Sequence, residues 1–172
     1  GALYTKEDIN NALAAETAEE RKRIVPSEDR SGHGTAVAGI MAGNGSSSGG
    51  VNRGAAPGSE LLVVKMGMTN EGGFPRTTEL MLGLDFVIRE AIHAGKPVAV
   101  NVSFGNSYGA HDGSSLLESY IDTVSQIWKN NIIIAAGNNA VSAGHFRAVM
   151  ISEKTLDADI SVSEYERSLN VQ

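Results

Sequence analysis

Ser31-Gly32-His33-Gly34-Thr35-Ala36-Val37-Ala38-Gly39 is the stretch that says most about the fold of this chain. Its small and apolar residues have helical spacing, and Ser31 or Asp29 can cap that helix, which places His33 in the first turn. The helix dipole favours a neutral imidazole there, the form that a general base needs. An isolated Gly-His-Gly fits a helix start with a polar surface histidine equally well, so the remaining motifs have to decide.

Several apolar runs and amphipathic segments follow that stretch. Helical spacing predicts helices over 6–15, 33–42, 76–93 and 115–129, and either a solvated turn or a second short helix over 18–23. Strands are predicted over 61–66, 98–103 and 132–136. The first is apolar except for Lys65 and the last is apolar throughout, as in parallel strands covered on both faces. The expected class is therefore α/β, a three-layer, mostly parallel sheet with helices on both faces. Beyond residue 147 the pattern changes, and 148–172 is expected to form a short-stranded extension, with strands over 149–152, 159–163 and 164–172.

Four motifs along the chain resemble those of the subtilisin-like serine proteases, the subtilases. His33 to Gly39 is similar to the family's histidine motif, and Gly54-Ala55-Ala56-Pro57 to its Gly-x-Ala-Pro turn. Further on come Ser103-Phe104-Gly105, similar to the substrate strand, and Ala135-Ala136-Gly137-Asn138, similar to the oxyanion motif. Segments 4–10 and 106–113 resemble the clostridial branch that includes the spore-germination proteases. The resemblance covers about residues 4–147.

The same resemblance assigns roles to individual residues. His33 is expected to act as the general acid and base, and Asn138 to donate its side-chain amide to the developing oxyanion. Backbone of the substrate strand is expected to bind an extended polypeptide, and small side chains are expected to line the pocket for the residue before the scissile bond. The substrate-binding residues are Ser103, Phe104, Gly105, Ala135, Ala136 and Gly137. His33 and Asn138 are expected to flank one groove at the top of one sheet.

Two catalytic motifs of the family are missing from this sequence. No Asp-[Ser/Thr]-Gly turn precedes His33, and no Gly-Thr-Ser-x-[Ala/Pro] element follows Asn138. Asp29 lies in the turn before the histidine helix, which is not where the family places its triad acid. Residues 1–172 are therefore interpreted as the middle of a subtilase catalytic domain, cut on both sides and inactive alone. The serines at 46–48 and 114–115 lie in glycine-rich loops with no strained turn to activate them.

The composition of the chain limits the classes of partner and cofactor that it is expected to bind. A formal net charge of −6 argues against nucleic acid or an anionic membrane as a partner, and no apolar run reaches the ~18 residues of a membrane span. The absence of cysteine excludes disulfides and zinc–thiolate sites, and the four histidines form no metal motif. The loop 43–54 has no carboxylate, so calcium is disfavoured there and would belong to the parent protein. His93 and His111 are interpreted as structural, and His145 as a residue of the cleft rim.

Competing interpretations remain open at this point. The leading one is a serine endopeptidase whose histidine, substrate strand and oxyanion asparagine lie in this chain. The alternative is a non-catalytic subtilase-like module that binds peptides or regulates a partner protease; a third is an α/β scaffold with a chance His-Gly-Thr. A Gly-Thr-Ser-x-[Ala/Pro] motif within about 300 residues downstream would favour the enzyme. Strands left without their neighbours have open edges, which predicts self-association.

Overall fold

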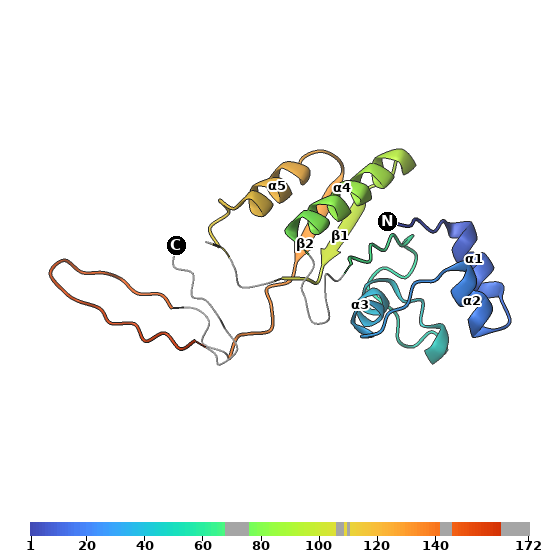
Figure 1. Ribbon diagram of the computed structural model, residues 1–172, viewed down its shortest axis with the longest axis horizontal. Coiled ribbons are helices and arrows are strands. Elements are labelled where there is room, and N and C mark those ends of the chain that lie inside the picture. The colour runs from blue at the N-terminus through green and yellow to red at the C-terminus, as the bar shows by residue number, and fades with distance from the viewer. Residues whose placement is uncertain (68–75, 106–108, 110, 142–145, 163–172) are drawn as a thin grey trace. The chain divides into compact units, whose positions relative to one another are not determined.

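The computed structural model describes residues 1–67, 76–105, 109, 111–141 and 146–162. The chain divides into two compact units, Gly1–Leu61 and Leu62–Gln172. The first contains α1 (Lys6–Ala14), α2 (Ala18–Ile24), α3 (His33–Ala42) and the short 3₁₀ helix η1 (Ser46–Ser48). The second contains α4 (Thr77–Ala94), β1 (Val98–Val102), α5 (Leu116–Val124) and β2 (Asn130–Ile134), as Figure 1 shows. The structure thus resolves the choice over 18–23 in favour of a helix.

Helices α1 and α2 of the first unit pack against each other, and both begin with a capping box. In α1 the Thr5 N–H donates to Asp8 Oδ2 at 2.7 Å, and the Asp8 N–H donates to Thr5 Oγ1 at 3.3 Å. These reciprocal bonds satisfy backbone donors that a helix start otherwise leaves without acceptors. They also lower the pKa of Asp8, chiefly through the hydrogen bond with the Thr5 side chain.

The loop after α3 folds back onto the end of that helix. The Gly54 N–H donates to Gly43 O at 2.8 Å, and the next two N–H groups donate to Ile40 O and to Met41 O. A Cβ on Gly54 would lie 2.6 Å from Gly43 N and 2.7 Å from Ala42 N, so only glycine fits this approach. Helical spacing predicts Val37, Ile40 and Met41 for the inner face of α3. This is wrong for Ile40, which is 75% exposed, whereas Ala42 is the buried residue of the helix.

Strands β1 and β2 of the second unit pair in parallel, with Val98 opposite Asn130 and Val102 opposite Ile134. Helices α4 and α5 pack on one face of this pair. The core consists of Leu80, Leu84 and Val102, with Met66, Val100, Phe104, Leu117, Tyr120, Ile121 and Ile132 packed against it. The alternate residues of both strands are exposed, among them Asn101 and Ile133. The parallel α/β class predicted from sequence is confirmed, and within the described residues both helices of this unit cover the same face.

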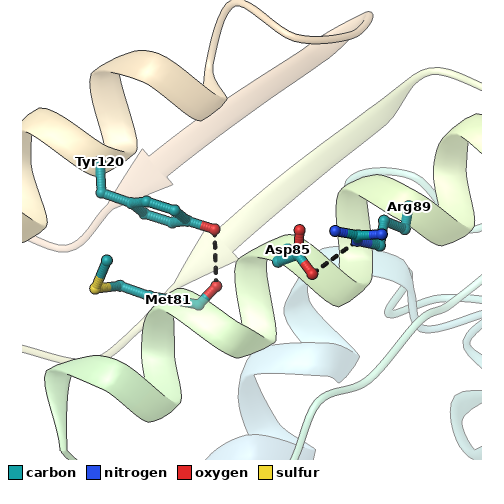
Figure 2. A network of polar contacts seen from close by, with 4 residues as sticks. All are labelled: Met81, Asp85, Arg89 and Tyr120. Atoms are coloured by element: carbon teal, nitrogen blue, oxygen red, sulfur yellow. Dashed lines mark hydrogen bonds and ion pairs between the residues drawn. The ribbon is translucent and has the colours of Figure 1, made fainter.

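Two hydrogen bonds from aromatic side chains fasten the helices and strands of this unit. The Tyr120 hydroxyl on α5 donates to Met81 O on α4 at 3.0 Å, beside the Asp85–Arg89 ion pair on the same helix (Figure 2). Burial raises the pKa of Tyr120, and the Asp85 charge raises it further. At the amino ends of the strands, Trp128 Nε1–H donates to Lys96 O at 2.8 Å. Helix α5 is therefore held to α4, and the turn before β2 is held to the residue before Pro97.

Several predicted elements are absent or shorter in the structure. Residues 61–66 form no strand, and Val63 is 72% exposed. The helix predicted over 115–129 ends at Val124, whose carbonyl accepts from Asn130 Nδ2 at 3.0 Å. Residues 149–152 and 159–162 form no strand either; residues 163–172 lie outside the described part. An apolar pattern gives a strand only where a neighbour supplies the hydrogen bonds.

Candidate active site

The carboxyl edge of the β1–β2 pair carries both segments that the sequence assigned to substrate binding. The Ala135 N–H donates to Val102 O at 3.1 Å, so the parallel pairing continues one residue beyond β2. Ser103, the next residue after β1, therefore leaves the sheet beside Ala135. Phe104 is half-buried against the core, whereas Ser103 and Gly105 on either side of it are exposed. Ligands of parallel sheets bind at this edge.

The oxyanion motif leaves β2 with all of its side chains exposed. Ala135, Ala136 and Gly137 are followed by Asn138, and none of the four is buried. Gly137 has a φ of 89°, in the left-handed region that glycine adopts without strain, so the chain changes direction just before Asn138. On the neighbouring strand, Asn101 Nδ2–H donates to Ser103 Oγ at 2.8 Å. The edge thus presents small exposed residues followed by the Asn138 carboxamide.

His33 is the first residue of α3 in the other unit, and it is exposed. Gly32 before it has a φ of 74°, and its N–H donates to Asp29 Oδ1 at 2.9 Å. Asp29 Oδ2 accepts from the Thr35 N–H at 2.9 Å and from the Thr35 hydroxyl at 2.7 Å. The His33 N–H donates to Ser31 Oγ at 3.2 Å, so Ser31 and Asp29 both cap the start of α3. The hydrogen bonds to its carboxylate, above all the one from the Thr35 hydroxyl, hold the pKa of Asp29 far below its usual value.

Asp29 is therefore occupied with the backbone and hydroxyl groups of the turn. Within the part of the chain that the structure describes, no hydrogen bond to the His33 ring is formed by Asp29 or by any other side chain. The sequence pattern suggested Asp29 only as a possible cap, and it missed that one carboxylate holds residues on both sides of His33. The spacing Asp-x-x-x-His, with serine and glycine between the two, was the available signal.

The structure brings some predicted residues together and leaves others apart. Residues 103–105 and 135–138 lie at one sheet edge. His33 belongs to the other unit, so its shared groove with Asn138 stays a prediction. In the loop before α5, Asp112 accepts from the Ser114 N–H at 2.9 Å, which gives that carboxylate a partner other than His111. His145 lies outside the described residues.

The described residues include neither a metal-ligand cluster nor a membrane-spanning helix. Across residues 1–67, 76–105, 109, 111–141 and 146–162, no three histidine, aspartate or glutamate side chains gather so that they could hold a metal ion. In the loop 43–54, where the sequence disfavours calcium, the Asn44 Oδ1 atom accepts a hydrogen bond from the Ser46 N–H at 3.0 Å. No described helix is both long and apolar enough to span a bilayer.

Comparison with known proteins identifies the family. A model of the peptidase family S8, the subtilases, matches residues 2–170. The chain is 25% identical over 158 residues to the serine protease AprX of Bacillus subtilis (strain 168), an alignment that covers 90% of this chain and 35% of AprX. It is 41% identical to the solved CspB protease of Clostridium perfringens, with a TM-score of 0.73 over 83% of this chain and 30% of that one. The chain spans about a third of the length of these two relatives.

Proposed function

This chain belongs to the subtilase family of serine peptidases, and we propose that it supplies the general base, the substrate strand and an oxyanion donor to a serine endopeptidase. The observation that carries the proposal is the parallel pairing of β1 with β2, continued by the bond between the Ala135 N–H and Val102 O. This pairing brings residues 103–105, of which Ser103 and Gly105 are exposed, next to the segment that ends in Asn138. The resemblance at His33 and the 41% identity to a solved protease support the same reaction.

In the proposed reaction, a serine outside the motifs of this chain attacks the carbonyl carbon of a peptide bond. The His33 imidazole takes the proton of that hydroxyl and later gives it to the leaving amine. The Asn138 amide donates to the oxygen that becomes negatively charged, an interaction worth about 3–4 kcal/mol in the transition state. Backbone of residues 103–105 binds the peptide as an added strand, so binding depends little on the peptide's side chains. The chain by itself is expected to bind peptide without hydrolysing it.

The size of the substrate residue before the scissile bond is the next part of the proposal, and it depends on the small residues Ala135, Ala136 and Gly137. They are exposed and leave room beside the sheet edge, so we propose a large apolar residue before the scissile bond.

The test uses the protein expressed from the complete reading frame that encodes this stretch. Hydrolysis of a chromogenic peptide is measured with and without a serine-directed fluorophosphonate. Asn138→Ala is expected to lower kcat by about 10²- to 10³-fold with little change in KM, because its amide acts on the transition state. Asn139→Ala, which changes the same residue type one position further on, is the matched control.

A second pair of variants tests the histidine. His33→Ala is expected to abolish turnover, and His93→Ala, at an exposed position near the end of α4, is expected to retain it. Turnover that survives His33→Ala, or equal losses in Asn138→Ala and Asn139→Ala, would refute the assigned roles. Peptide binding without turnover in the unmodified full-length protein would instead identify the non-catalytic module.

A further inference from the structure

We propose that Asp29 is a positioning residue for the general base, because its carboxylate fixes the turn from which the His33 side chain emerges. This inference rests on the proposed function of His33. It assigns Asp29 no contact with substrate and no proton transfer, and it separates Asp29 from the triad acid, which would bond to the ring itself.

The hydrogen bonds of Asp29 reach both sides of His33 along the chain. Oδ1 accepts from the Gly32 N–H at 2.9 Å, and from the Ser31 N–H at 3.2 Å and hydroxyl at 3.3 Å. Oδ2 accepts from the Thr35 N–H at 2.9 Å and from its hydroxyl at 2.7 Å. One carboxylate therefore binds the residue before His33 and the residue two positions after it.

The start of α3 depends on this carboxylate because the N-cap residue of the helix has no side-chain acceptor for the first backbone N–H groups. Gly32 occupies the N-cap position with a φ of 74° and has no side chain that could accept a hydrogen bond. Helix starts normally take that acceptor from the N-cap side chain, and here Asp29 provides it from three residues upstream. The backbone direction at His33, and with it the origin of the imidazole, is set by a turn that Asp29 holds.

Positioning of this kind has a direct effect on rate. A general base works only when its nitrogen lies within hydrogen-bond reach of the proton that it removes, and a misplacement of about 1 Å can lower the rate about 100-fold. The hydrogen bonds also keep the pKa of Asp29 well below its usual value, so the carboxylate stays charged at every pH at which a histidine works as a base. The turn therefore persists over the working range of the imidazole.

The competing explanation is that Asp29 only stabilises a helix, as Asp8 does in α1. Asp8→Asn is therefore the matched control, because it removes a capping carboxylate of the same kind from the same unit. Asp29→Asn keeps the size of the side chain but replaces one acceptor oxygen with an NH₂ group, which then faces an N–H donor. In the full-length protein we expect Asp29→Asn to lower kcat about 10- to 100-fold with KM changed less than about threefold, and Asp8→Asn to leave kcat unchanged.

A second readout needs no turnover and uses the 172-residue chain. In ¹³C- and ¹⁵N-histidine-labelled protein, Asp29→Asn should shift the ring signals of His33 and leave those of His93 in place. Asp8→Asn should move neither. Because Asp29→Asn could unfold α3, the milder Thr35→Val, which removes only the hydroxyl donor to Oδ2, is measured as well and should shift the His33 ring signals more than Thr35→Ser.

Unchanged His33 ring signals in both Asp29→Asn and Thr35→Val would overturn the proposal, as would equal losses of kcat in Asp29→Asn and Asp8→Asn. If the unmodified full-length protein shows no peptide hydrolysis, the proposed function fails. The ring signals of the 172-residue chain then still decide whether Asp29 fixes His33.

Discussion

Leu84 on α4 offers the sharpest test of how the second unit holds its site. It is 2% exposed and lies in the core with Leu80 and Val102, directly behind the strand that continues into Ser103. Leu84→Ala removes three carbon atoms from this core, and at about 0.8 kcal/mol each the loss of burial alone amounts to about 2.4 kcal/mol. The cavity left behind raises the expected loss in free energy of unfolding to about 3 kcal/mol.

The matched control is Leu82→Ala, two residues away on the same helix. Leu82 is 69% exposed, so the same arithmetic gives at most about 0.7 kcal/mol. Leucine and alanine have similar helix propensities, and the difference between the two variants therefore reports burial. Comparable losses in both would refute the assignment of Leu84 to the core.

Urea unfolding followed by tryptophan fluorescence measures this effect in the right unit. The chain has one tryptophan, Trp128, and it lies in the second unit. With an m-value of about 1.5 kcal/mol per M, Leu84→Ala should lower the midpoint by about 2 M. The expected companion effect is weaker peptide binding at residues 103–105, since β1 is held less firmly.

Two further predictions concern single contacts. Tyr120 has a raised pKa in the folded chain, so its contribution to stability is complete below the unfolded pKa of about 10 and is lost as the pH rises through the folded value. Tyr120→Phe should remove that alkaline loss and cost about 1 kcal/mol at neutral pH, which urea unfolding at pH 7 to 11 measures; an unchanged pH profile would contradict it. Gly54→Ala should destabilise the first unit strongly, because the added Cβ would lie 2.6 Å from Gly43 N, whereas Gly58→Ala meets nothing within 4 Å and should be nearly neutral. Far-UV circular dichroism during thermal unfolding compares the two, and equal melting temperatures would contradict the close approach.

Helices with a strong local signal could be predicted from the sequence. The expected helix over 33–42 matches α3, and that over 76–93 differs from α4 by one residue at each end. Gly95 follows α4 with a φ of 65°, the left-handed conformation that glycine often takes at the end of a helix, and Pro97 comes two residues later. Apolar spacing and capping residues both lie within the helical segment or next to it, so these helices could be found from sequence alone.

Features that depend on a distant partner could not be predicted in the same way. Residues 61–66 have the composition of a buried strand, but a strand also needs a neighbour's hydrogen bonds. The apolar spacing that ends at Trp128 predicted a longer α5. It gave no sign that the Asn130 side-chain amide would donate a hydrogen bond to the Val124 carbonyl. At the candidate site, the motifs indicated His33 and Asn138, but the bonds from Asp29 to both sides of His33 follow only from coordinates.

The indole of Trp128 has a consequence for the opposite end of the sheet. The Trp128 indole donates to Lys96 O, and the Val98 N–H donates to Lys129 O, so two hydrogen bonds join the amino ends of β1 and β2. Sliding one strand by a single residue would turn every side chain to the other face, and these two ties prevent that slip. If a peptide pairs with residues 103–105 as proposed, it would pair with a strand whose register is set five residues away, at Val98.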